Sequence, residues 1–358
     1  MDNKKKLNVL DLFSGCGGLS QGFKMAGFNI AGAIDNDIDS IKTFKNNFKK
    51  GKFFVKDINK ITKSEIKKNF KNIDVIIGGP PCQGFSNANR WHKNQNDPRN
   101  LLFLKFIEFV KIIRPKLLLI ENVSGILSRL NGNIIKNINK ILKKNGYHIN
   151  YKLLDASEFG VPQLRKRVFI VGNRLNNEDF RKYLKNKKKV TVGEAISELY
   201  PLEKNFKNKL NGTLANGYIK YLRRKNSKLP NHQIVYPAKS TIEKIKHVKQ
   251  GENWQSIPEH LFKKNRNNRH SSAFKRLKEN DFSVTIDTGN AHSNYFHPIF
   301  NRIPTPREAA RIQSFKDNFE FIGSRTSQYR QIGNAVPPLL AKEIAKTFKK
   351  IIFNKWKI

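Results

Sequence analysis

The stretch LNVLDLFSGCGGLSQGFKMA, Leu7 to Ala26, decides the fold at the start of the chain. Its apolar run 7–13 predicts a buried strand, the glycines that follow predict a tight turn, and 19–26 has helical spacing. Further strands are predicted at 30–34, 53–55, 73–77, 117–120, 147–154 and 168–171, and further helices at 102–113, 134–144 and 338–353. Strands that alternate with helices predict an α/β fold, with a mostly parallel sheet, helices on both faces and ligands at the carboxyl ends of the strands.

The run GGPPCQGFS, Gly78 to Ser86, follows one of these strands and contains one of the two cysteines of the chain. Prolines stiffen its backbone and glycines allow close contact with a ligand, as expected around an exposed nucleophile. The alternative for Cys82 is a buried cysteine that packs as a small apolar residue. Because Cys16 lies in a different motif, no zinc site, disulfide framework or other metal site is expected.

Several segments, in this order, resemble the DNA (cytosine-5-)-methyltransferase family of the prokaryotic restriction-modification type. They are DLFSGCGGLS from Asp11, GGPPCQGFS from Gly78, ENV from Glu121, QLRKR from Gln163, RIPTPREAARIQSF from Arg302 and QYRQIGNAVPP from Gln328. The resemblance implies a Rossmann-like methyltransferase sheet that uses S-adenosyl-L-methionine, plus a smaller, irregular target-recognition domain. We expect a catalytic and cofactor-binding domain at 1–189, target recognition at 190–327, and a C-terminal segment, 328–358, that returns to the catalytic domain.

The family pattern implies a covalent reaction on a cytosine that has been flipped out of the DNA duplex. Cys82 would add to ring carbon 6, Glu121 would meet ring nitrogen 3, and Arg165 would lie near the cytosine carbonyl and the nucleophile. Arg167 alternates with Arg165, so an extended segment would direct both side chains to one face. The alternatives are a strand-end salt bridge for Glu121 and a solvent-facing basic strand for the arginines. The base that removes the carbon 5 proton is not identified.

The cofactor residues implied by the resemblance follow the first strands of the sheet. A Gly-rich turn with Asp35 at the end of the next strand is also found in nicotinamide enzymes, although the full GxGxxG pattern is absent. The alternative interpretation of Asp57 is that it caps a helix N-terminus, and the alternative for Asn334 is that it is a turn residue. The predicted cofactor-binding residues are Asp11, Phe13, Gly15, Gly17, Gly18, Asp35, Asp57, Ile58, Pro80 and Asn334.

The charge of the chain suits a partner that is a polyanion. The net charge is +41, from 69 basic and 28 acidic residues, although a genome rich in A and T also yields many lysines. The resemblance implies that this partner is double-stranded DNA, and the stretch 86–100 is long enough for a loop that closes over it. The predicted DNA-binding residues are Gln83, Ser86, Arg90, Arg99 and Gln163. Sequence recognition is expected between 190 and 301, with no residue assigned to a base, and 304–314 is expected to organise that domain.

Other features set the expected context and the competing hypotheses. No signal peptide or membrane span is expected, and the chain is predicted to be a cytoplasmic monomer whose cognate restriction endonuclease is a genetic rather than a physical partner. One alternative keeps the chemistry but acts on transfer RNA. Another is a DNA-binding regulator of the same fold without catalysis, although Cys82, Glu121 and Arg165 are all present.

Overall fold

The computed structural model describes residues 6–81, 98–128, 133–203, 217–223, 229–262, 274–288 and 295–354, without the side chains of 98–101 and 133. The chain forms two compact units. The first contains Met1–Asp155, Lys166–Asn186 and Pro338–Ile358, and the second contains Ala156–Arg165 and Lys187–Pro337. The units divide the chain differently from the expected domains, because 156–165, 187–189 and 328–337 fall in the second unit.

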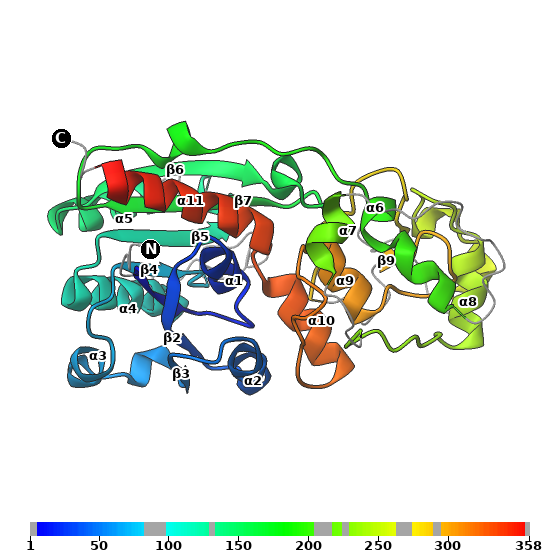
Figure 1. Cartoon of the computed structure of the whole chain (residues 1–358). Helices are drawn as coiled ribbons and strands as arrows, with labels where there is room; N and C mark the ends of the chain where they lie inside the picture. Colours follow the sequence, from blue (N-terminus) through cyan, green and yellow to red (C-terminus); the bar gives the residue numbers. More distant parts are fainter. Residues whose placement is uncertain are drawn as a thin grey trace. The chain divides into compact units, whose positions relative to one another are not determined.

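The first unit is built on a seven-stranded sheet in the order β3-β2-β1-β4-β5-β7-β6 (Figure 1). The neighbours from β3 to β5 pair in parallel, whereas β7 runs antiparallel to both β5 and β6. The strands are β1 (Asn8–Leu12), β2 (Asn29–Asp35), β3 (Lys52–Val55), β4 (Val75–Gly78), β5 (Leu117–Val123), β6 (His148–Asp155) and β7 (Lys166–Asn173). The strand order reverses between β1 and β4, which is where doubly wound sheets bind ligands. The predicted α/β fold is confirmed.

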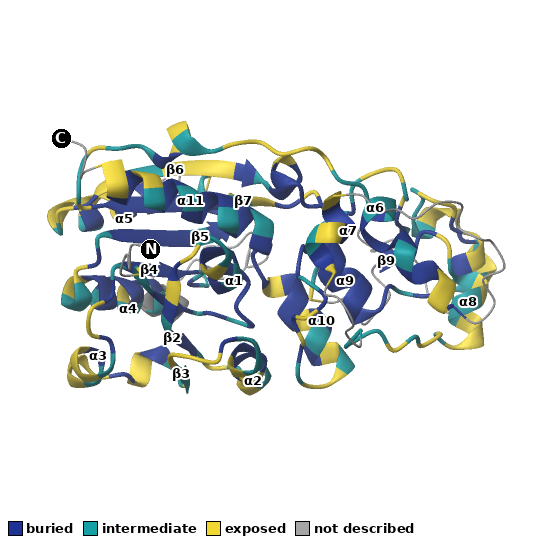
Figure 2. Cartoon of the chain, in the orientation of Figure 1, coloured by how far each residue is buried: buried dark blue, intermediate teal, exposed yellow. Residues whose placement is uncertain are grey.

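Helices cover both faces of this sheet. They are α1 (Gly18–Met25), α2 (Ile38–Asn47), α3 (Lys63–Asn69), α4 (Pro98–Ile113), α5 (Asn133–Lys144) and α11 (Pro338–Asn354). On one face, α3, α4 and α5 share with the strands a buried core that includes Leu12, Ile66, Phe106 and Leu142. The central strands β1, β4 and β5 are buried over most of their length (Figure 2). Helices α2 and α3 were not predicted, although Asp37 caps α2 and Thr62 with Glu65 forms a capping box for α3.

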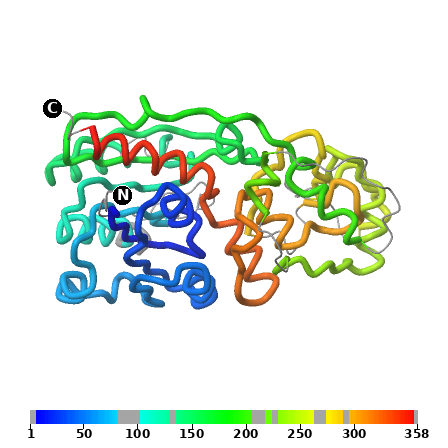
Figure 3. The backbone as a smooth tube through the Cα atoms, in the orientation of Figure 1, coloured from blue at the N-terminus to red at the C-terminus, as the bar shows by residue number. Residues whose placement is uncertain are grey.

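On the opposite face, α1 packs closely against the C-terminal helix α11, so both ends of the chain meet in the first unit (Figure 3). A Cβ atom at Gly22 would lie 2.3 Å from that of Ala341, so this contact requires glycine. The rings of Phe23 and Phe348 meet edge to face at 5.5 Å between centroids. Helix α11 thus helps to hold the helix that follows the glycine turn.

The second unit is mostly helical and irregular. Its elements are α6 (Val192–Ile196), α7 (Gly217–Leu222), α8 (Lys239–Lys246), α9 (Pro306–Ile312), α10 (Arg325–Asn334) and a short parallel pair, β8 (Lys275–Arg276) with β9 (Tyr295–Phe296), besides 3-10 turns at Ala156–Phe159, Ser197–Leu202, Trp254–Ser256 and Glu259–Leu261. Its core contains buried ion pairs, from Arg302 to Glu203 and Glu308 and from Arg311 to Asp317. The helix α9 side chains thus bind residues outside the helix and organise this unit.

Candidate active site

The loop that leads to Cys82 is anchored to the end of β5. The side-chain amide of Asn122 donates to the carbonyl oxygen of Pro80 at 3.0 Å, and both groups are buried. A Cβ atom at Gly79 would lie only 3.0 Å from Glu121 Oε2, so the bare glycine backbone lies directly against this carboxylate. The segment two residues before Cys82 is therefore held beside Glu121.

The carboxylate of Glu121 also pairs with an arginine of the neighbouring strand. Arg167 Nε lies 3.2 Å from Glu121 Oε1, and the side chains of Arg167 and Glu121 are only 18% and 13% exposed. Antiparallel pairing of β5 with β7 sets this contact, because Val123 lies opposite Arg167 and Glu121 opposite Phe169. The salt bridge that was the alternative for Glu121 is present, and it places a guanidinium beside the carboxylate at the ligand edge of the sheet.

Arg165 and Gln163 lie in the second unit, outside the sheet, and both are buried. Arg165 Nη1 donates to the carbonyl oxygen of Ile286 at 3.2 Å. Gln163 is fully buried, and both ends of its amide are used: Nε2 donates to Gln313 Oε1, and Oε1 accepts from the Ile286 amide at 3.1 Å. The interpretation of Arg165 as part of a solvent-facing strand is therefore wrong. The Gln163 amide is thus used internally, and the DNA contact predicted for this residue stays a prediction.

The turn after β1 has the shape that its glycines predicted. Phe13, Gly15 and Gly17 all have positive φ angles, of 59°, 51° and 98°. Such angles are easy for glycine but strained for phenylalanine, and strain of this kind clusters at ligand sites. A Cβ atom at Gly17 would lie 2.8 to 2.9 Å from the rings of Phe44 and Phe48. Gly18, also predicted at this site, is buried and begins α1.

Carboxylates surround this turn. Asp35, at the end of β2, accepts from the Gly15 amide at 2.8 Å and from the Asp37 amide at 2.9 Å, and burial raises its pKa. Asp11, on β1, is fully buried, and its Oδ2 accepts from Ser20 Oγ at 2.6 Å. Burial raises the pKa of Asp11 to about 7, and Oδ1 has no hydrogen-bond partner among the described residues. The site therefore offers acceptors and negative charge.

The end of β3 contributes two more predicted residues. Asp57 Oδ1 accepts from the Asn59 amide at 3.0 Å and so caps the 3-10 turn Ile58–Lys60, as its alternative predicted. Ile58 is buried, whereas Val55, which lies opposite Asp35 in the sheet register, is 43% exposed. Val55 is an apolar residue at this edge that sequence reasoning missed. The signal available in the sequence was its position at the end of a strand, two residues before Asp57.

The remaining predicted residues are placed as follows. Asn334 is the exposed last residue of α10, in the second unit. Cys82, Gln83, Ser86 and Arg90 lie outside the described residues, and Arg99 lies in α4 with its side chain also outside them. The other cysteine, Cys16, is buried, and burial raises the pKa of its thiol, so it stays protonated and inert. Only Cys82 is left to supply a reactive thiolate.

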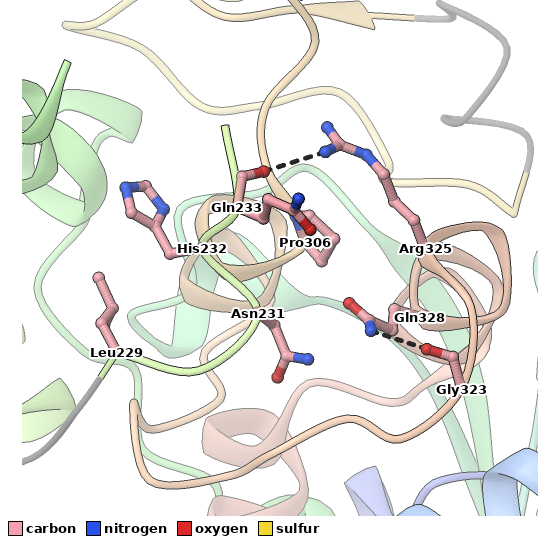
Figure 4. A pocket seen from close by; sticks show the side chains of 8 residues that line it. All are labelled: Leu229, Asn231, His232, Gln233, Pro306, Gly323, Arg325 and Gln328. Carbon is pink, nitrogen blue, oxygen red and sulfur yellow. Dashed lines mark hydrogen bonds between the residues drawn. The ribbon is translucent and has the colours of Figure 1, made fainter. Parts of the chain in front are cut away.

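A polar hollow lies in the second unit beside the first turn of α10 (Figure 4). Arg325 donates to the Gln233 carbonyl oxygen at 3.0 Å, and Gln328 donates to that of Gly323 at 2.9 Å. The described lining residues include a guanidinium but no carboxylate, and they are Leu229, Asn231, His232, Gln233, Pro306, Gly323, Arg325 and Gln328. Such a lining suits an anionic group.

The described part of the chain has neither a clustered metal-ligand set nor a membrane-spanning helix. It contains no group of three or more His, Cys, Asp or Glu side chains arranged to hold a metal ion. It also contains no helix with the length and apolar character needed to cross a bilayer.

Known proteins resemble the chain over nearly its whole length. Residues 7–350 match the family described as C-5 cytosine-specific DNA methylase. The type II methyltransferase M.DdeI of Desulfomicrobium norvegicum is 34% identical, with 95% of this chain and 88% of the relative covered. M.FnuDI of Fusobacterium nucleatum is also 34% identical, with 98% and 97% covered. A solved Escherichia coli structure, a putative prophage-encoded DNA modification methyltransferase, is 29% identical with a TM-score of 0.76, and 97% and 99% of the two chains are covered.

These matches agree with the geometry, in which Pro80, Asn122, Glu121 and Arg167 meet at the edge of an α/β sheet whose first strand is followed by a glycine turn. The chain belongs to the C-5 cytosine-specific DNA methylase family and is a DNA (cytosine-5-)-methyltransferase.

Proposed function

We propose that the enzyme methylates carbon 5 of a flipped-out cytosine within a short, specific sequence of double-stranded DNA, through a covalent bond between Cys82 and the base. The observation that carries the proposal is the Asn122 to Pro80 hydrogen bond of 3.0 Å. It fixes the loop two residues before Cys82 beside Glu121, whose carboxylate is in turn held by Arg167. A nucleophile and an acid at one strand edge are the groups that this chemistry needs.

The side chains have complementary tasks on the cytosine ring. The Cys82 thiolate bonds to carbon 6, and Glu121 supports the electron density that moves to nitrogen 3 through a hydrogen bond or a proton. Carbon 5 thereby becomes nucleophilic and takes the methyl group. When the carbon 5 proton leaves, the bond from Cys82 to carbon 6 breaks and the thiolate is regenerated. Arg165 is proposed to contact the cytosine carbonyl, whereas Arg167 orients Glu121.

The residues around the glycine turn fit S-adenosyl-L-methionine. When bound, this cofactor supplies an electrophilic methyl group on a cationic sulfonium. The buried Asp11 oxygen without a described partner can accept from a donor group of a cationic ligand, and Asp35 and Asp57 supply further acceptors. The same negative charge would repel a pyrophosphate, which argues against a nicotinamide dinucleotide. Phe13, Ile58, Val55 and Pro80 are proposed to supply apolar surface, and Asn334 to close the site.

Target recognition is proposed to reside in the second unit, together with Gln83, Ser86 and Arg90 and with Arg99 at the start of α4. The net charge of +41 favours contacts to DNA phosphates. The hollow at Arg325 is a candidate for one of them, because it is polar and its described lining contains no acid. Taking a base out of the stack costs about a few kcal/mol, which such contacts must supply.

The biological role that we propose is protection of host DNA in a restriction-modification system. The support is that the relatives at 34% identity are named type II methyltransferases. The cognate endonuclease would be a genetic partner only, and the enzyme would act as a monomer on each strand.

A direct test is to incubate the protein with S-adenosyl-L-methionine and unmethylated genomic DNA, and then to map methylated cytosines by sequencing. We expect methylation at carbon 5 within one short motif. Transfer RNA should be included in parallel, since label in transfer RNA with none in DNA would refute the proposed substrate. Absence of label in both would favour a regulator without catalysis.

The covalent step has its own test, because fluorine at carbon 5 cannot leave as the proton does. DNA with 5-fluorocytosine at the mapped target should trap a complex that survives denaturing electrophoresis. Cys82→Ala should abolish the trap, and Cys16→Ala serves as the matched control that keeps it. A complex that persists in Cys82→Ala would exclude Cys82 as the nucleophile.

A further inference from the structure

The second unit contains a continuous chain of buried amide hydrogen bonds that ends on Arg165. Segments 162–165 and 283–286 run side by side: Ser283 N donates to the Pro162 carbonyl oxygen at 3.0 Å, and Leu164 N donates to that of Ser283 at 2.9 Å. Thr285 Oγ1 donates to the Leu164 carbonyl oxygen at 2.7 Å. The carbonyl oxygen of Ile286 then accepts from Arg165. The backbone of 283–286 thus sets where this guanidinium lies.

Two glutamines extend this chain to the end of α10. Gln163 accepts from the Ile286 amide and donates to Gln313, which in turn donates to the carbonyl oxygens of Ile332 at 2.9 Å and Ala335 at 2.7 Å. Gln163 and Gln313 are both fully buried. A buried amide that loses its partner keeps the full cost of its desolvation, so every link restrains the next.

The backbone groups at the two ends fix the direction of both amides. Two carbonyl oxygens at the α10 end require the NH₂ group of Gln313 there, so its oxygen must face Gln163. Gln163 then presents its own NH₂ group to Gln313 and its oxygen to the Ile286 amide. If either amide rotated by half a turn, donors would face donors or acceptors would face acceptors. A carboxylate in place of either glutamine would likewise face an acceptor with an acceptor.

The segment that holds Arg165 continues toward the predicted recognition stretch. Residues 287 and 288 pack on α10 so closely that a Cβ atom at Gly333 would lie 2.5 Å from the carbonyl carbon of Asp287. The residues that follow, 289–294, lie outside the described part and belong to the basic, irregular region where sequence recognition was expected. The described backbone of 283–288 therefore both holds Arg165 and packs on α10.

We infer that Gln163 and Gln313 are positioning residues that couple the 283–288 segment of the second unit, and through it engagement of the target sequence, to the placement of Arg165. They act on the rate of methyl transfer and on discrimination between target sequences, not on overall DNA affinity. The inference rests on the proposed function, because it assumes that Arg165 contacts the cytosine and that this segment meets DNA. A displacement of about 1 Å at a catalytic group costs on the order of 100-fold in rate.

The test uses the full chain with Gln163→Leu, Gln313→Leu, the double variant, and the nearly isosteric Gln313→Glu. The exposed Gln255→Glu in the same unit is the matched control. Single-turnover methylation at saturating DNA should slow by about 10- to 100-fold in each variant. The KM for DNA should stay within about threefold, and the preference for the target over a single-mismatch site should fall. The double variant should be no slower than the slower single one, as expected for links in one chain.

Several outcomes would overturn the inference. One is a Gln313→Leu enzyme that methylates at the wild-type rate, and another is a loss that affects only the KM for DNA. A third is a double variant whose loss of rate equals the product of the losses in the two single variants. If the leucine variants fail to fold, Gln313→Glu decides, with melting temperature and duplex affinity measured on the same preparation. A wild-type enzyme that does not methylate DNA would instead refute the proposed function, whereas active wild-type enzyme with fully active variants refutes this inference alone.

Discussion

The sharpest consequence of the site geometry concerns Gly79, which lies against the carboxylate of Glu121. An alanine Cβ there would lie 3.0 Å from Oε2, whereas carbon to oxygen contacts in proteins run about 3.3–3.6 Å. The carboxylate must therefore move by roughly 0.3 Å or more, against the restraint from Arg167 at 3.2 Å on its other oxygen. Since about 1 Å costs on the order of 100-fold, Gly79→Ala should slow methyl transfer by about threefold to tenfold.

The assay is single-turnover transfer of labelled methyl groups to the mapped target, at saturating DNA and cofactor. The expected loss is equivalent to about 0.6–1.4 kcal/mol in the barrier. Gly217→Ala is the control, because Gly217 has no described neighbour within 4 Å of its would-be Cβ and no positive φ angle. In a Glu121→Gln background, Gly79→Ala should have no further effect. A wild-type rate for Gly79→Ala, or an undiminished effect in that background, would refute the reasoning.

Further predictions concern the cofactor turn, the hollow and the packing of α10. Burial raises the pKa of Asp11 from 3.8 to about 7, so the folded state binds this proton more tightly and loses stability as pH rises between these values. Asp11→Asn should flatten that part of the curve of Tm against pH and weaken cofactor binding in calorimetry; an unchanged curve contradicts it. Arg325→Gln should lower the slope of log Kd for duplex DNA against log salt by about one, and the exposed Arg330→Gln should not. Equal slopes in both would remove Arg325 from the DNA contacts. Gly333→Ala should destabilise the second unit by about 1–3 kcal/mol through its clash with Asp287, measured as a fall in Tm that Gly217→Ala does not share.

The sheet was predictable because its strands are short, apolar and separated by turn signals. Every predicted strand from 30–34 to 168–171 overlaps an observed one, and their ends differ by at most three residues. Helices α2 and α3 were missed because they are short, have few apolar residues and contain several lysines. Their stability therefore depends on caps and on packing against the sheet. The antiparallel direction of β7 was also hidden, since strand direction depends on pairing that no local pattern encodes.

The site was predictable wherever a residue follows directly from a strand end. Asp35, Asp57, Glu121 and the Gly78 loop all lie at the carboxyl edge of the sheet, because parallel strands place their ends together. The contacts of Asp11 were harder to foresee. Its position on a strand suggested the site, but its complete burial under Ser20 and its raised pKa depend on the packing of α1.

Alternation along QLRKR did not foresee that Gln163 and Arg167 belong to different compact units, for a physical reason. A period of two assigns Gln163, Arg165 and Arg167 to one face only if the segment stays in one layer. The boundary between the compact units falls between Arg165 and Lys166, so the alternation serves different surroundings on its two sides. Arg167 pairs with Glu121 in the sheet, whereas Arg165 and Gln163 bind the backbone of Ile286 in the second unit. A short segment thus assigns one guanidinium to the unit that holds the carboxylate and the other to the unit proposed to recognise the target.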